Sequence, residues 1–238
     1  MNPVQLINRP GHARLVLTCE HASCAIPPEY DDLGLDEREI RDHIGWDIGA
    51  HAVTAWLAHE LDATAVLSGV SRLVIDCNRD LSDHDLIVAE SHGVRVPGNA
   101  AVDAGERRRR IGDFYRPYHE AIDAVLAERR SVFLFSVHTF TPELNGRERR
   151  FDAGVLFDEC AADAERFGGS LINAGLRVRY NEPYSGLDGL IYSARTHGRR
   201  HGLRYLELEV NNRLVRDEAN ARAIAARVAG ALRTIVEV

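Results

Sequence analysis

Short apolar runs that end in polar side chains constrain the fold of this 238-residue chain most strongly. Runs of this length and composition are typical of buried strands in an α/β sheet. They lie at residues 15–19, 73–75, 132–137 and 206–210, with histidine, asparagine, arginine or glutamate within or soon after them. In open α/β sheets, ligands bind beyond the carboxyl ends of the strands. The runs therefore predict a sheet with a ligand site at its carboxyl edge.

Segments with helical spacing of apolar residues separate these runs. Asp36 is a suitable N-cap and Glu39 completes a capping box, so a helix is predicted to begin there. A second helix should kink or divide at Pro117, and a third is predicted over residues 159–174. A last amphipathic helix should follow residue 210. The apolar stripe of the first helix would be Ile40, Ile44, Ile48, Val53, Trp56 and Leu57.

The alternation of strands and helices predicts an α/β fold, a three-layer α/β/α sandwich. Residues 64–68 and 72–75 suggest two strands joined by a turn at Gly69, which indicates a mixed, mostly parallel sheet. Residues 80–105 form a loop-like stretch longer than an ordinary connection, which favours a lid or binding loop. No linker, composition break or repeat divides the chain, so we expect one domain over residues 1–238.

Composition argues against several classes of protein. Charged residues make up 27% of the chain and hydrophobic residues 45%, values that are ordinary for a globular domain and argue against disorder. No apolar stretch approaches the roughly 18 residues needed to span a bilayer, and no signal peptide is evident. We therefore expect a cytoplasmic protein with no membrane partner. A net charge of -7 argues against nucleic acid, despite the four consecutive arginines at 107–110.

The cysteines and the common catalytic motifs narrow the chemistry further. Cys19, Cys24, Cys77 and Cys160 form no CxxC pair, and disulfides are not expected in a cytosolic chain. A catalytic cysteine at Cys19 or Cys24 stays open because both lie near His21. Glycine-rich nucleotide-binding motifs and the GxSxG elbow of serine hydrolases are missing from the sequence.

A metal site is one interpretation of the histidines at the strand ends. Catalytic zinc needs about three nitrogen or oxygen ligands and an open position, and His21 and His138 form a natural pair. Asp47 is the expected third ligand, since a part-buried carboxylate on the first helix needs a partner or a metal. Glu20 is the alternative third ligand, and Asp47 with His51 could chelate alone. Structural histidines and a surface ion pair remain the non-catalytic interpretation.

Two further segments supply groups suited to catalysis. Asn78 and Arg79 follow the run at 73–75, and a guanidinium fork suits a carboxylate or a developing oxyanion. Strand alternation places Glu207 and Glu209 on one face, where a general base beside a metal is one use. The alternatives are an ion pair of Arg79 with a neighbouring aspartate and an edge strand whose acidic face lies in water.

Seven short motifs follow one another along nearly the whole chain. They are CEHAS with Ile26-Pro27, WDIGA, VIDCNRD, Pro97-Gly98-Asn99, YRPYHEAI, SVHTFTP, and NEPYSG with THG and LELEVNN. In this order they resemble the N-formylglutamate amidohydrolase family, which has a zinc-dependent exopeptidase-like fold. One segment differs, since many family members carry Pro-His-Ser-Gly where this chain has residues 20–23, which indicates a sister subfamily.

The resemblance implies a role for each candidate residue. Zinc, one ion per chain, would be held by two histidines and a carboxylate, the asparagine–arginine pair would engage the substrate, and a late glutamate would be the general base. By position, the implied metal ligands are His21, Asp47 and His138, the substrate contacts Asn78, Arg79, Asn181 and His197, and the catalytic residues Glu209 and Arg79.

The predicted function is metal-dependent hydrolysis of an N-formyl or small N-acyl amino acid, with N-formylglutamate preferred. The substrate would be a small anion, the pathway amino-acid breakdown such as histidine degradation, and a homo-oligomer stays open. Two alternatives remain: a non-catalytic binder of acyl-amino acids, and a zinc amidase or peptidase acting on other N-acyl amino acids or peptides.

Overall fold

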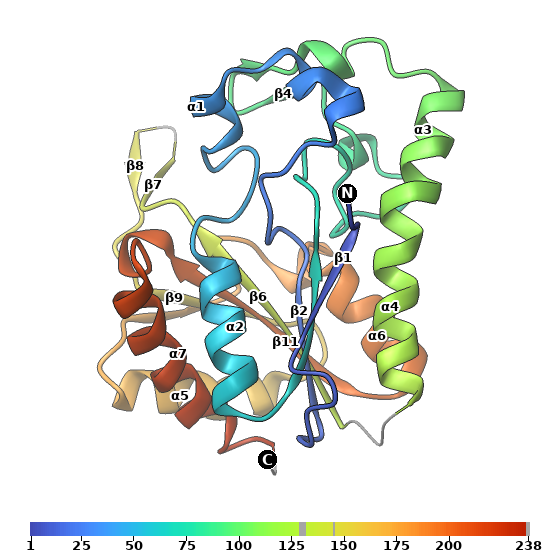
Figure 1. The fold of residues 1–238 in the computed structure, drawn as a ribbon. Helices are drawn as coiled ribbons and strands as arrows, with labels where there is room; N and C mark the ends of the chain where they lie inside the picture. Colours follow the sequence, from blue (N-terminus) through green and yellow to red (C-terminus); the bar gives the residue numbers. More distant parts are fainter. Residues whose placement is uncertain (129–131, 145, 237–238) are drawn as a thin grey trace.

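The computed structural model describes residues 1–128, 132–144 and 146–236. In that part of the chain a seven-stranded sheet has helices on both faces, which gives the predicted three layers (Figure 1). The strand order is β1-β3-β2-β6-β11-β9-β10. The strands are β1 (Val4–Ile7), β2 (Leu15–Cys19), β3 (Thr64–Ser68), β6 (Phe133–Phe140), β9 (Ala153–Leu156), β10 (Val178–Tyr180) and β11 (Arg204–Asn211).

Two groups of helices cover the sheet. One face packs against α2, α5 and α7, and the other against α4 and α6, with a hydrophobic cluster on each side (Figure 1). Two small hairpins, β4–β5 (Glu90–Ser91, Val94–Arg95) and β7–β8 (Glu143–Leu144, Arg147–Glu148), stand beside the sheet. The helices are α1 (Glu37–Ile40), α2 (Ala50–Glu60), α3 (Ala104–Arg110), α4 (Arg116–Ala127), α5 (Ala161–Asn173), α6 (Tyr192–His201) and α7 (Glu218–Leu232).

The sheet is mixed, as predicted, but the expected hairpin does not cause it. Antiparallel pairing occurs between β1 and β3 and between β9 and β11, while β3, β2, β6 and β11 run parallel. Residues 72–75 form a buried turn instead of a strand. Side chains satisfy its backbone, since Asn99 donates to the Leu73 carbonyl and Arg110 donates to the Val74 carbonyl. The apolar run was a sign of burial, and the strand prediction there was wrong.

The long helix predicted from residue 36 is also wrong beyond its first turn. Asp36 and Glu39 form the expected capping box, but α1 ends at Ile40 and α2 begins at Ala50. Gly49 caps α2 with a φ of 89°, a left-handed conformation that glycine adopts without strain. Asp47 therefore lies in the loop between two helices, and the prediction that it belongs to the first helix was wrong.

The helix around Pro117 is not divided, because α3 and α4 form one continuous helix (Figure 1). A π-helical turn over Ile111–Tyr115 joins α3 to α4, and Pro117 lies in the first turn of α4, where its missing N–H costs little. Helix α6, in the glycine-punctuated segment before β11, has no counterpart among the predicted elements. The loop-like stretch at 80–105 contains the β4–β5 hairpin.

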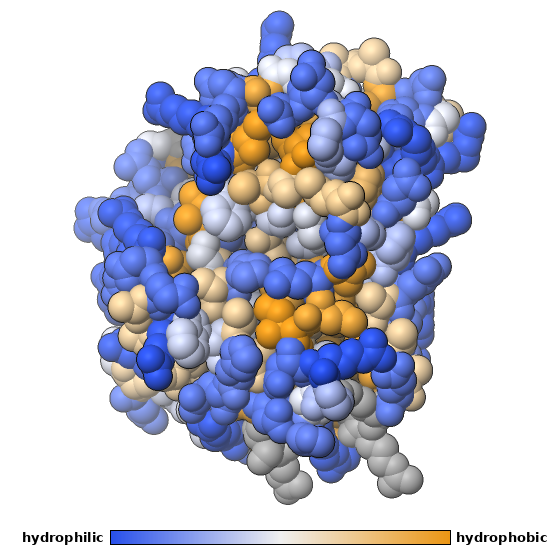
Figure 2. All heavy atoms as spheres, viewed as in Figure 1, coloured by the Kyte–Doolittle hydropathy of each residue, from blue (hydrophilic) through white to orange (hydrophobic). Residues whose placement is uncertain are grey.

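The polarity of the surface and the state of the cysteines can be compared with what the composition suggests. Figure 2 shows that hydrophilic side chains cover most of the viewed face, with apolar side chains exposed in separate patches. No helix among the described residues combines the length and the apolar character that crossing a bilayer requires. The four cysteines, all in the described part of the chain, are free, and Cys19 and Cys77 are buried.

The two faces of the central strands differ in polarity towards their carboxyl ends. On β2, β6 and β11, the residues that face α4 and α6 begin as the apolar Val16, Leu134 and Tyr205. Two residues further along each strand they become polar, whereas the opposite face is apolar except for Thr139 near the end of β6 and Arg204 at the start of β11. The polar positions are Thr18 and Glu20 near the end of β2, Ser136 and His138 on β6, and Glu207 and Glu209 on β11.

Candidate active site

A cavity of about 280 Å³ opens at the carboxyl end of these strands. Its walls include His138 from β6 and Glu209 from β11, together with side chains from three loops. His21 comes from the loop after β2, Asp47 from the loop before α2, and Asn78 from the segment after β3. Residues that are far apart in the sequence thus meet at the predicted edge of the sheet.

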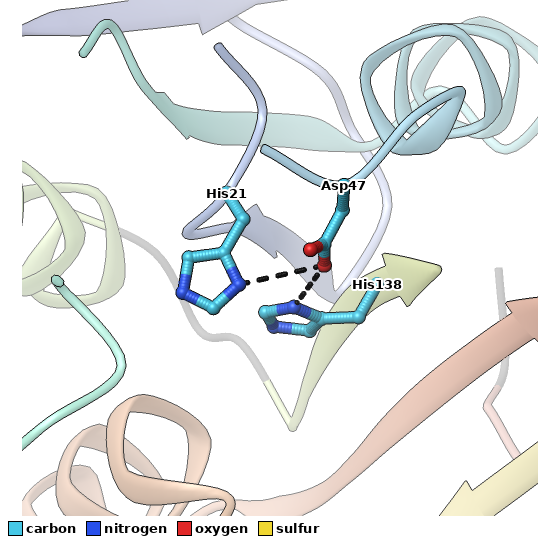
Figure 3. A group of neighbouring side chains, drawn as sticks. All are labelled: His21, Asp47 and His138. Carbon is cyan, nitrogen blue, oxygen red and sulfur yellow. Dashed lines mark hydrogen bonds and ion pairs between the residues drawn. The ribbon is translucent and has the colours of Figure 1, made fainter. Parts of the chain in front are cut away.

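The innermost group consists of His21, Asp47 and His138, all buried. Figure 3 shows both imidazole rings directed at the Asp47 carboxylate. The Nδ1 atom of His138 lies 2.8 Å from Asp47 Oδ2, and the Nδ1 atom of His21 lies 3.4 Å from the same oxygen. The loop that carries Asp47 is held against this group, because the Asp47 N–H donates to the His21 carbonyl at 3.0 Å.

A second carboxylate orients each histidine from behind. The Nε2 atom of His21 lies 2.7 Å from Asp76 Oδ1, and the Nε2 atom of His138 lies 2.9 Å from Glu20 Oε2. An ionised carboxylate only accepts hydrogen bonds, so both Nε2 atoms carry the hydrogen. The Nδ1 lone pairs of neutral rings are then directed at Asp47, the arrangement that outer carboxylates impose on metal-binding histidines.

This geometry fits a metal ion better than a network of protein hydrogen bonds. His138 Nδ1 can donate to Asp47 only when the ring is protonated, and His21 Nδ1 has no hydrogen-bond partner in the described structure. Two imidazole nitrogens and one carboxylate oxygen are a common ligand set of catalytic zinc, and these three residues offer atoms within 4.8 Å of one another. Glu20 lies on the far nitrogen of His138, so it suits an orienting role better than that of the third ligand.

The charges around this group also favour a cation. Burial raises the pKa of Asp47, but the nearby His21 and His138 lower it well below its ordinary value. Burial lowers the pKa of His138, yet Glu207 and the hydrogen bonds to Asp47 and Glu20 raise it strongly. Both shifts arise because carboxylates are packed around the two rings, surroundings that favour a positive charge at this point.

Glu207 and Glu209 both line the cavity, so strand alternation predicted their shared face correctly. In the parallel pairing of β6 and β11, Glu209 lies directly opposite His138. Its Oε2 atom is buried and has no hydrogen-bond partner in the described structure. Burial raises the pKa of Glu209 well above its usual range and that of Glu207 to about 7. Glu207 differs because Asn78 Nδ2 donates to it at 3.3 Å.

Asn78 and Arg79 both reach the cavity wall, although they follow a turn instead of the predicted strand. The Asn78 amide is fixed on both sides, since its Oδ1 accepts from the Ser193 N–H at the start of α6. Arg79 is held less firmly. Its Nη1 donates to the Asn78 carbonyl at 3.2 Å, and its Nε lies 3.9 Å from Asp83. The partly exposed guanidinium is therefore suited to an incoming anion.

Two of the predicted substrate contacts lie elsewhere. Asn181 is not among the residues lining the cavity, and its Oδ1 accepts from the Phe157 and Gly186 N–H groups at 3.0 and 3.1 Å. It holds a turn with its own φ at 52°. His197 does not line the cavity either and contacts His119 instead. Neither side chain lies at this cavity wall, and the two substrate contacts stay predictions from the sequence.

Other residues of the site were not predicted. Arg72 lines the cavity and binds Asp76 at 2.7 Å, so it supports the carboxylate that orients His21. Behind His138, Glu20 also accepts from Ser136 Oγ at 2.6 Å and from Tyr118 Oη at 2.9 Å. The YRPYHEAI and VIDCNRD motifs contain Tyr118 and Asp76, but spacing alone gave no sign of these contacts.

Comparison with known proteins identifies the class. A family model described as N-formylglutamate amidohydrolase matches residues 13–216. A gene product from Agrobacterium tumefaciens of known crystal structure is 34% identical, with a TM-score of 0.93 over 99% of this chain and 96% of that one. N-formylglutamate amidohydrolase from Ralstonia eutropha is 17% identical, with a TM-score of 0.65 over 100% and 98% of the two chains. No curated protein gave a significant match.

The chain is therefore an enzyme, a hydrolase that acts on amide bonds. Within that class it belongs to the N-formylglutamate amidohydrolase family. The α/β fold with its mixed, mostly parallel sheet agrees with the fold expected for this family from the sequence.

Proposed function

We propose that this protein hydrolyses the amide bond of a small N-acyl amino acid, with N-formylglutamate the preferred substrate and zinc the cofactor. The observation that supports this most is the convergence of His21, Asp47 and His138 near Glu209, whose Oε2 has no hydrogen-bond partner in the described structure. It joins a three-ligand metal site to a candidate base in one cavity, and the family is one of amidohydrolases.

His21, Asp47 and His138 would hold the metal. When bound, zinc supplies Lewis-acid activation of water and of the scissile carbonyl. The protein supplies the proton transfers. The Glu209 carboxylate accepts a proton from the attacking water and then delivers it to the nitrogen of the leaving amino acid, so that formate and glutamate are released. Its buried position and raised pKa keep it a stronger base than an exposed glutamate.

Arg79 would bind a carboxylate of the substrate. Its guanidinium lies at the cavity wall, with its Nε 3.9 Å from Asp83 Oδ2, and can offer paired N–H donors. The fixed Asn78 amide would place the acyl group beside it. A cavity of about 280 Å³ suits a small dianion and leaves little room for a folded peptide chain.

A panel assay tests this proposal. Zinc-loaded protein is given N-formylglutamate, N-formylaspartate, N-acetylglutamate, N-formylleucine and a short cell-wall-type peptide amide, and release of the free amine is measured. The expected result is highest kcat/KM on N-formylglutamate. No turnover of any formyl or acetyl amino acid would contradict the substrate, and turnover of the peptide alone would favour the alternative of a zinc peptidase.

Metal content separates the enzyme from a binder that has kept only the pocket. Protein purified without chelator should contain zinc in the cavity and lose it in His138→Ala. The cytoplasmic location, a role in histidine degradation and the organisation of residues 1–238 as one domain remain predictions from the sequence.

A further inference from the structure

A second group of histidine and carboxylate side chains lies between α4 and α6, among residues that do not line the cavity. His197 and His201 are four residues apart on α6 and present nitrogens to the same side. His197 Nδ1 lies 2.7 Å from Asp123 Oδ1, and His201 Nε2 lies 2.9 Å from the same oxygen. Asp123 belongs to α4, so three donors from two neighbouring helices converge on one point.

This spacing needs little adjustment to hold an ion. In a tetrahedral site with bonds of about 2.0–2.1 Å, ligand atoms stand about 3.3 Å apart. The two nitrogens lie 2.7 and 2.9 Å from Asp123 Oδ1, which is about half an ångström short of that separation. Histidines at i and i+4 on one helix face are a common way to present two imidazoles to zinc.

His119 orients the buried ring of this group. Its Nδ1 lies 2.8 Å from His197 Nε2, and the two rings stack with centroids 5.1 Å apart. The hydrogen of this contact can belong to either ring. If His197 donates it to His119, the Nδ1 lone pair of His197 is directed at Asp123, where a bound cation would accept it.

The surroundings leave a ligand position open. Arg200 forms an ion pair with the other carboxylate oxygen, Asp123 Oδ2, and leaves Oδ1 to the histidines. His197 is buried, but Asp123 and His201 are partly exposed, so a water molecule can reach the open position. Imidazole nitrogens with a carboxylate oxygen suit zinc and related first-row divalent metals better than magnesium or calcium.

We propose that Asp123, His197 and His201 form a second site for a divalent transition metal, zinc in the first instance, which joins α4 to α6. Its role is structural, because no candidate base of the cavity contacts it in the described structure. The Ser193 N–H of helix α6 donates to Asn78 at the cavity wall. The second metal site would therefore hold a helix that supports this wall.

Counting zinc in four chains tests the proposal. Metal-free wild type, His138→Ala, His201→Ala and the double variant are dialysed against buffered micromolar free zinc, and bound zinc per chain is measured by mass spectrometry. We expect two, one, one and none. His84→Ala, which removes an exposed histidine flanked by Asp83 and Asp85, is the matched control and should still bind two.

The result that overturns the proposal is equal zinc in the His138→Ala chain and in the double variant. The proposal is also overturned if wild type binds one zinc and only His138→Ala removes it. If wild type binds one zinc and only His201→Ala removes it, the second site stands and the metal proposed for the cavity is contradicted. The unaltered chain gives an independent readout, since the second equivalent should shift the ring NMR signals of His197 and His201. His119→Phe keeps the stacking but should weaken this site about 10–100-fold, whereas a plain hydrogen-bond cluster predicts no change in zinc binding.

Discussion

The molecule contains two groups of histidine and carboxylate with similar composition and different surroundings. The cavity group, His21, Asp47 and His138, is buried and is backed by further carboxylates on the outer nitrogen of each histidine. The helix group around Asp123 is partly exposed, has a histidine as outer partner, and has its charge balanced by Arg200.

The difference shows that ligand identity alone does not make a catalytic site. Outer carboxylates raise the basicity of ligand histidines and add negative charge that favours a divalent ion. Of the two groups, the cavity group also faces a space that a substrate can enter and a glutamate, Glu209, whose Oε2 has no hydrogen-bond partner in the described structure. We therefore assign catalysis to the cavity group and a structural role to the helix group.

The largest effect is expected from removal of a cavity ligand. His138→Ala should lose both the cavity metal and essentially all turnover, because two remaining ligands bind zinc weakly. Zinc content and kcat are measured on the same preparation, and His201→Ala serves as the comparison because it should keep turnover. Full activity of His138→Ala with the cavity metal gone would remove the metal from the mechanism.

A smaller effect is expected from the outer carboxylates. Glu20→Gln keeps an acceptor for His138 but removes the charge, so the dissociation constant for the cavity metal should rise about 10–100-fold. Activity should return at saturating zinc. A calorimetric zinc titration measures this, with the exposed Glu143→Gln as control. An unchanged dissociation constant would show that Glu20 does not tune the ligand.

The smallest effect concerns substrate binding. Arg79→Lys keeps the charge and loses the fork, so KM for N-formylglutamate should rise about tenfold, the loss of roughly one charged hydrogen bond. The kcat value should change less than KM. Steady-state kinetics beside Arg95→Lys, an exposed arginine on β5, provide the check. A decrease in kcat with an unchanged KM would contradict a role in substrate binding and would indicate that Arg79 stabilises the transition state.

The sequence supported the sheet, its mixed character and the shared face of Glu207 and Glu209, because strand alternation follows directly from backbone geometry. It could not give the register that sets Glu209 opposite His138, since register depends on how distant strands pair. The prediction of residues 72–75 as a strand failed because a buried turn and a buried strand have the same apolar composition.

The position of Asp47 was predicted for a wrong reason. Helical spacing suggested a part-buried helix face, whereas the break at Gly49 puts Asp47 in a loop that reaches the histidines. The orienting role of Asp76 depends on a contact with His21 across 55 positions of sequence, which no local pattern reveals. Asn181 and His197 lie in family motifs but not at the cavity wall, because such motifs also contain residues that hold turns and helices together.

The assignment of Glu209 as general base is tested most directly by measuring turnover and cavity zinc in Glu209→Gln. This change keeps the volume and removes the proton acceptor, so kcat should fall about 10²–10⁴-fold while zinc content and fold stay at the wild-type level. Glu207→Gln is the matched control on the same strand face and should have a milder effect. Near-normal turnover in Glu209→Gln, or loss of the cavity zinc as in His138→Ala, would contradict the assignment.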